Sequence, residues 1–354
     1  MTRNTLRIAL MLVFMALFLA LIYVEKTRAK HVLIIHSYNT DYSWVEAINE
    51  GIERVLEDQR GVFTRYHYLD LKNHGGEDFR RTATQLAIRV VEETQPDVLV
   101  LFDDAAQVLV GQRFYEGDGE GTPGIKVVYG GVNGDPASYY GDSNSVSGIL
   151  ERKPMAVIRD IALTILHEQV AQGEAPITDP KIVFIGDTSD SITADLPHYS
   201  SIDWAPFEWL EPVQVGTFDD WKEAVQRGGE EADVILVTNY QQIRETPGGP
   251  FIRPASQAMK WADANATVPI VGMGWTNSED GAMLSVSVSP YEQGEVAIRE
   301  ALAVLEGAEP MGAITSKQFL VHICHPALAR RGVTVPFIHE AFARATGNYY
   351  TEGC

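Results

Sequence analysis

The chain has 354 residues, 45% hydrophobic and 21% charged, which is typical of a globular protein of about two domains and excludes disordered, collagen-like and coiled-coil classes. Its 48 acidic against 28 basic residues give a net charge of −20, and no Lys/Arg cluster offsets it, so we expect no nucleic-acid partner. The 2 cysteines exclude a disulfide scaffold and any four-cysteine metal site.

The N-terminus carries an export signal or a membrane anchor. Residues 8–24 are seventeen uncharged, mostly apolar residues that follow Arg3 and Arg7. As a helix they would reach about 25 Å, just short of the hydrocarbon core of a bilayer and slightly long for a signal peptide. We expect residues 1–29 to be a signal peptide or, slightly favoured, an uncleaved inner-membrane anchor. The rest of the chain would then be periplasmic or otherwise extracytoplasmic.

From residue 31 onward, short apolar runs alternate with amphipathic stretches. The apolar runs predict strands at 31–36, 63–69, 98–102, 126–129, 181–185, 234–237, 269–272 and 283–288. The amphipathic stretches predict helices at 44–56, 78–94, 155–169, 218–226, 255–264 and 291–305. Repeated strand–helix units of this kind predict an α/β fold of parallel sheets with right-handed crossovers.

Candidate binding residues follow the predicted strands, because open parallel sheets bind ligands beyond the carboxyl ends of their strands. In the first half these residues are Ser37, Tyr38, Trp44, Asp103, Asp104 and Asn133. In the second half they are Asp187, Asn239, Tyr240 and Trp275. Aromatic, amide, hydroxyl and carboxylate groups favour a small organic ligand held by stacking and hydrogen bonds over a phosphorylated one.

Most of these residues also have a purely structural alternative. Helix capping would account for Ser37 and Tyr38 and for one of Asp103 and Asp104, leaving the other aspartate to receive an amine or ring NH from the ligand. Core or interlobe packing would account for the two tryptophans. Turn formation would account for Asn133 and Asp187.

Three stretches carry a family resemblance. They are HVLIIHSYNTDYSWVEAINEGIERVL (31–56), the pair PDVLVLFDDAA (96–106) and IKVVYGGVNGDP (125–136) closing in VSGILER (146–152), and GAMLSVSVSPYEQGEVAIREALAVLEG (281–307). The chain resembles the extracytoplasmic solute-binding proteins of ABC transporters, and in particular the ABC-transporter substrate-binding-like branch, which also occurs as sensory modules. Unlike the family pattern, it has no lipobox cysteine after the apolar run.

The resemblance implies a type I periplasmic-binding-protein fold. In this fold two Rossmann-like lobes, each a parallel sheet flanked by helices, are joined by a multi-strand hinge and close on a ligand in the cleft. It implies a first lobe of residues 30–150 plus about 289–318, a second lobe of 151–288 plus about 319–347, and a tail of 348–354.

Catalytic and metal motifs are not found in the sequence. It has no Gly-x-Ser-x-Gly elbow, Gly-x-Gly-x-x-Gly turn or phosphate-binding loop, so we expect neither an enzyme nor a cofactor. His322-Ile323-Cys324-His325 alternates along a predicted strand, so we expect no metal site there. Cys324 and Cys354 would be able to pair in an oxidising compartment, but we expect a free, buried Cys324. The acidic run 116–120 lacks calcium-loop spacing and predicts a solvated turn.

The function that follows is solute capture. We expect an extracytoplasmic binding protein that holds an amino-acid-like, aromatic or heterocyclic solute and serves an ABC permease. The alternative is a membrane-tethered ligand-sensing module for a signalling partner.

Overall fold

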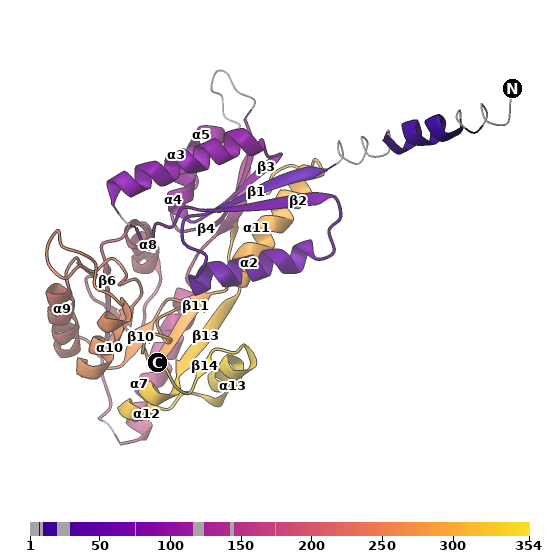
Figure 1. The fold of residues 1–354 in the computed structure, drawn as a ribbon. Coiled ribbons are helices and arrows are strands. Elements are labelled where there is room, and N and C mark those ends of the chain that lie inside the picture. The colour runs from indigo at the N-terminus through magenta and orange to yellow at the C-terminus, as the bar shows by residue number, and fades with distance from the viewer. Residues whose placement is uncertain are drawn as a thin grey trace.

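The computed structural model describes residues 7, 10–19, 29–74, 76–115, 124–141, 145–173 and 175–354. Within these residues the chain forms two lobes, each built around its own sheet (Figure 1). The sheets are parallel except where β11 meets β13. The predicted α/β class with two lobes is confirmed.

The first lobe contains a six-stranded sheet in the order β12-β5-β4-β3-β1-β2. Its strands are β1 (Lys30–His36), β2 (Val62–Tyr68), β3 (Val98–Phe102), β4 (Lys126–Val132), β5 (Val146–Leu150) and β12 (Ala313–Thr315). Its helices are α2 (Ser43–Leu56), α3 (Glu77–Thr94), α4 (Asp104–Ala106), η1 (Gln107–Gly111), α5 (Gln112–Phe114), α6 (Ala137–Tyr140) and α11 (Pro290–Leu305). Alternate residues of β1 point to opposite faces of the sheet and pack in two hydrophobic cores. Val32 and Ile34 pack on the side of α2 and α11. Leu33 and Ile35 pack on the side of α3.

The second lobe contains an eight-stranded sheet in the order β14-β13-β11-β10-β9-β6-β7, with β8 also paired to β6. Its strands are β6 (Lys181–Asp187), β7 (Glu208–Trp209), β8 (Val213–Val215), β9 (Val234–Val237), β10 (Ile270–Gly272), β11 (Leu284–Val288), β13 (Phe319–Cys324) and β14 (Tyr349–Tyr350). Its helices are α7 (Met155–Ala171), α8 (Asp190–Ser201), α9 (Phe218–Glu231), α10 (Ser256–Asn265), α12 (His325–Arg331) and α13 (Phe337–Ala345).

Three segments cross between the lobes and are tied to one another. They lie between β5 and α7, between β11 and α11, and between β12 and β13. The Glu292 carboxylate accepts hydrogen bonds from the backbone amides of Lys317 (3.0 Å) and Gln318 (2.8 Å). The Arg152 amide donates to Ser316 Oγ at 3.0 Å. These bonds join the crossings into one hinge.

Helices α2 and α11 pack closely because each presents a glycine to the backbone of the other. A Cβ atom at Gly294 would collide with the carbonyl oxygen of Ile48, and one at Gly51 would collide with the carbonyl oxygen of Tyr291. Only glycine permits so close a backbone approach. The pair of helices covers one face of the first sheet (Figure 1).

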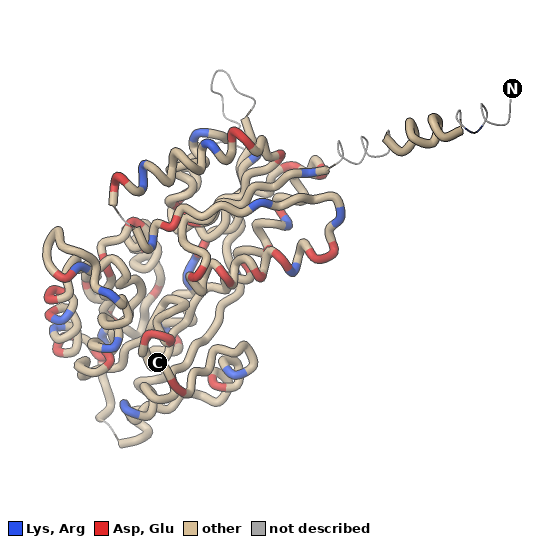
Figure 2. The backbone as a smooth tube through the Cα atoms, viewed as in Figure 1, with Lys and Arg blue, Asp and Glu red and all other residues tan. Residues whose placement is uncertain are grey.

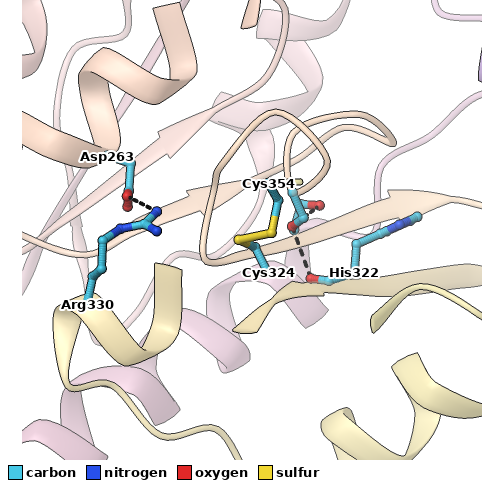
Figure 3. Close-up of a disulfide and its surroundings, with 7 residues drawn as sticks. Asp263, His322, Cys324, Arg330 and Cys354 are labelled. Carbon is cyan, nitrogen blue, oxygen red and sulfur yellow. Dashed lines mark hydrogen bonds and ion pairs between the residues drawn. A yellow bond between two sulfur atoms is a disulfide. The ribbon is translucent and has the colours of Figure 1, made fainter. Parts of the chain in front are cut away.

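The C-terminal residues belong to the second lobe. β14, which falls in the expected tail, pairs in parallel with β13, and the chain then turns back so that Cys354 reaches Cys324. The two form a disulfide with Cα atoms 6.0 Å apart (Figure 3). The expectation of a free Cys324 was wrong, because the short strand that positions Cys354 carries little sequence signal. Beside the disulfide, Arg330 of α12 pairs with Asp263 of α10 at 2.8 Å.

The acidic run 116–120 lies outside the described residues, whereas residues 10–19 of the apolar segment 8–24 are described and are helical. In the part of the chain that the structure describes, no helix is long and apolar enough to span a bilayer. Figure 2 shows Lys and Arg dispersed among the more numerous Asp and Glu over both lobes.

Candidate functional site

A cleft opens between the lobes at the carboxyl ends of the strands. The first lobe contributes Tyr38 after β1, Lys72 after β2, Asp103 after β3, Asn133 after β4 and Glu151 after β5. The second lobe contributes residues after β9 and β10 and at the end of β11, namely Thr238, Asn239, Gln241, Met273, Gly274, Trp275, Thr276, Asn277, Ser287 and Val288. An inner and an outer part of the cleft share six lining residues, which are Tyr38, Lys72, Asp103, Ser191, Asn239 and Gln241.

Eight of the ten predicted residues line this cleft. The inner part is lined by Tyr38, Trp44, Asp103, Asn133, Asn239 and Trp275. Asp104 and Asp187 line only the outer part. Asp187 is the last residue of β6, and its carboxylate accepts hydrogen bonds from the amides of Ser189 and Gln242 at 3.0 Å each.

Ser37 and Tyr240 are not among the residues that line the cleft. Ser37 Oγ donates to the carbonyl oxygen of Phe102 at 2.8 Å and accepts from the amide of Ala106 at 3.0 Å, which ties β1 to the turn after β3. Tyr240 is fully buried, and its hydroxyl donates to Asp280 at 2.6 Å. Both side chains are hydrogen-bonded to structural partners and lie outside the cleft lining.

The two neighbouring aspartates have different surroundings. Asp104 accepts from the amides of Asn133 (3.0 Å) and Gly134 (2.8 Å) and from the hydroxyl of Tyr139 (2.7 Å), so it holds the loop after β4. Asp103 has φ +72°, a strained conformation for a residue other than glycine. It lines both parts of the cleft. Of the two aspartates, only Asp103 lines the inner part of the cleft.

Burial in the cleft sets the protonation of Asp103. Desolvation, together with the charge of Asp104, raises the pKa of Asp103 to about 7, although hydrogen bonding from Tyr38 and the charge of Lys72 act in the opposite direction. Near neutral pH a cationic ligand group would therefore favour the ionised carboxylate.

Aromatic rings and a lysine face Asp103. Tyr38 and Tyr42 meet edge to face with ring centroids 5.8 Å apart. The Lys72 ammonium lies 4.6 Å from the Tyr38 ring centroid and 5.1 Å from that of Tyr42. This arrangement offers a ligand both a stacking surface and a positive charge.

Trp275 reaches across the cleft from the second lobe. Its Nε1 donates to Ser43 Oγ of the first lobe at 3.1 Å, and its ring packs edge to face against Tyr291 at 6.1 Å. It therefore combines interlobe packing with a place in the cleft lining.

A buried charge cluster adjoins the cleft at the hinge. Lys153 Nζ lies 2.8 Å from Asp195 of α8 and 3.4 Å from Glu151. Asp195 also accepts from the hydroxyl of Tyr199 (2.6 Å) and from Asn133 Nδ2 (3.3 Å). Burial works against a charged Lys153, but the neighbouring carboxylates outweigh it and its pKa lies well above the ordinary value.

Sequence reasoning did not select this cluster, although part of its signal was present. Glu151 and Lys153 directly follow β5, so the same strand-end argument applied to VSGILERK would have found them. Asp195 carries no such signal, because it lies inside α8. Among the described residues no group of three or more His, Cys, Asp or Glu side chains is arranged to hold a metal ion.

No protein-family model matches the chain, and no curated protein matches it in sequence. Solved structures do match. A ligand-free, open substrate-binding protein with adhesive properties from Clostridium difficile has a TM-score of 0.62 at 14% identity, over 87% of this chain and 96% of that one. An ABC domain in complex with L-Trp from Streptococcus pneumonia has a TM-score of 0.60 at 13% identity, over 89% and 98%.

A third match is a carbohydrate-transporter solute-binding protein from Agrobacterium radiobacter in complex with D-arabinose, with a TM-score of 0.53 at 12% identity, over 89% of this chain and 98% of that one. The fold is that of the type I periplasmic binding proteins. The type I fold puts the strand ends of both lobes on one cleft. This explains why residues far apart in the sequence, such as Tyr38 and Trp275, line it together.

Proposed function

We propose that this protein captures a small organic solute in the interlobe cleft, closes on it and presents it to an ABC permease. The observation that supports this most strongly is the cleft itself, which is lined by strand ends of both lobes and bordered by three hinge crossings. A ligand that contacts both lobes binds the closed form better than the open one and so shifts the population towards it.

The lining favours an amino-acid-like or aromatic solute. Asp103 suits an amine, Lys72 suits a carboxylate, and the rings of Tyr38, Tyr42 and Trp275 suit an apolar or aromatic body. The structural neighbour solved with L-Trp supports this ligand class, and the neighbour solved with D-arabinose makes sugars the class to test beside it.

The Cys324–Cys354 disulfide supports an extracytoplasmic site of action. Structural disulfides persist in oxidising compartments and are rare in the cytosol. Solute capture for uptake takes place in such a compartment, so the disulfide and the proposed function agree.

The test begins with native mass spectrometry of the full chain, exported and gently purified. A small mass that co-purifies and is lost on denaturation identifies the solute. Calorimetric titration with that solute, or with a panel of L-amino acids and pentoses when none co-purifies, then gives the affinity. The absence of binding to every member of the panel, together with a clean apo mass, would refute capture of this solute class.

Two variants and their matched controls test the site. Asp103→Ala and Trp275→Ala should each weaken binding about 10- to 100-fold, the range expected for losing a charge-assisted hydrogen bond or an aromatic contact in a cleft. Asp219→Ala, on the exposed face of α9, and Trp261→Ala, packed within the second lobe, should bind normally. Unchanged affinity in both cleft variants would refute the site while leaving the fold as described.

A further inference from the structure

A chain of side-chain hydrogen bonds runs from the C-terminal strand to the wall of the cleft. Ser287 of β11 lines the inner cleft, and its Oγ lies 3.0 Å from Nε2 of His322 on β13. Nδ1 of His322 lies 3.4 Å from the hydroxyl of Tyr350 on β14. That hydroxyl donates to Oε1 of Glu279 at 3.1 Å.

The direction of these bonds follows from their last member. Burial raises the pKa of Glu279. The ionised carboxylate can only accept, so the Tyr350 hydroxyl uses its proton there and its oxygen accepts from Nδ1–H of His322. A neutral imidazole has one N–H, so Nε2 of His322 is left as an acceptor. Burial lowers the pKa of His322 to about 3, which keeps the ring neutral.

This bonding pattern determines which hydrogen-bonding groups Ser287 can offer in the cleft. Its hydroxyl proton is used in the bond to His322, so the oxygen retains only lone pairs for any other partner. His322 is held firmly in place, because the Trp275 ring packs edge to face on it at 4.8 Å and the Tyr350 ring lies parallel to it at 6.5 Å. β14 in turn is held by its pairing with β13, which ends at the disulfide (Figure 3).

We propose that Glu279, Tyr350 and His322 are positioning residues that hold Ser287 as a hydrogen-bond acceptor, so that the cleft selects solutes presenting an N–H or O–H donor at that point. This selectivity rests on the proposed function of solute capture. We call the hydrogen-bonded chain Glu279–Tyr350–His322–Ser287 the relay. It does not serve acid–base catalysis, because His322 has no exposed surface and a proton taken from Ser287 would leave a buried imidazolium.

The relay is tested without any ligand by ¹⁵N NMR of the histidine side chains in the full chain. Wild-type His322 should be the neutral Nδ1–H tautomer at pH 8. Tyr350→Phe removes the acceptor that fixes this tautomer and should yield a mixture. Tyr349→Phe changes the neighbouring ring of the same strand and should leave His322 unchanged. A wild-type Nε2–H tautomer would overturn the relay, because the Ser287 hydroxyl would then be free to donate to the cleft.

The selectivity is tested with matched solutes. The probes are L-amino acids and the corresponding acids that lack the amine, L-phenylalanine and 3-phenylpropionate among them, titrated by calorimetry. Wild-type protein should prefer the donor-bearing member, and Ser287→Ala should reduce that preference about 5- to 10-fold, as expected for one hydrogen bond. Tyr350→Phe should reduce it in the same direction.

The outcomes separate the two proposals. A preference that is unchanged in Ser287→Ala overturns the selectivity but leaves solute capture intact. If wild-type protein binds neither member of any pair, both the selectivity and the proposed amino-acid-like ligand are refuted. The tautomer of His322 then still tests the hydrogen-bond relay.

Discussion

Replacing Lys153 by methionine removes the cation from the buried cluster at the hinge. The Lys153 side chain is 6% exposed and lies between Asp195, 2% exposed, and Glu151, 15% exposed. Methionine is similar in length and flexible, so it can occupy the same space without its charge. The variant therefore isolates the electrostatic contribution.

The expected cost is large because both carboxylates stay buried. Removing one partner of a buried ion pair costs about 3–5 kcal/mol, most of it from the charge left uncompensated. Exposed ion pairs contribute about 1 kcal/mol or less. Lys181→Met is the matched control, since Lys181 pairs with Glu208 at 3.5 Å and both side chains are about half exposed.

The pH dependence follows from the same carboxylates. Burial raises the pKa of Glu151, and in the wild type the charge of Lys153 opposes that rise. Without Lys153 the folded-state pKa moves further above its unfolded value, so the variant loses stability as pH rises through that pKa. The destabilisation should therefore be greater at pH 8 than at pH 5.

Urea unfolding followed by tryptophan fluorescence, at pH 5 and pH 8, measures both effects. The reasoning is refuted if Lys153→Met lies within about 1 kcal/mol of wild type at pH 8, as an exposed pair would. It is also refuted if the loss is greater at pH 5.

Three further predictions concern the disulfide, the cleft carboxylate and the helix contact. Cys354→Ser should lower the free energy of unfolding by roughly 3.5 kcal/mol, from the entropy of closing a 30-residue loop, and equal urea midpoints with and without the bond would contradict this. Because the pKa of Asp103 is raised to about 7, affinity for an amine-bearing solute should increase from pH 6 to pH 8 in wild type but not in Asp103→Asn. Calorimetry that gives the same change of affinity with pH in both proteins would contradict this. Gly294→Ala should destabilise by about 1–3 kcal/mol through overpacking, whereas Gly216→Ala, with open space at its Cβ, should leave the unfolding midpoint nearly unchanged.

The fold was predictable because its signals are local. Alternating apolar strands and amphipathic helices predict parallel sheets. The apolar run Val98–Phe102, for example, predicts a strand, and the structure has a strand with these bounds. The strand-end argument also needs only local information. It places Tyr38, Asp103 and Trp275 at one edge of their sheets, and all three line the cleft.

Only the tertiary structure decided which strand-end side chains face the cleft and which are used elsewhere. Asp104 is bound by partners about thirty residues along the chain, and Ser37 by partners almost seventy residues away, so neither role is written in the local pattern. The same holds for Asp195 beside Lys153 and for Cys354 beside Cys324. Hydrophobic periodicity determines elements and their order, whereas the partner of a buried polar group depends on which segments the packed lobes bring within about 3 Å of it.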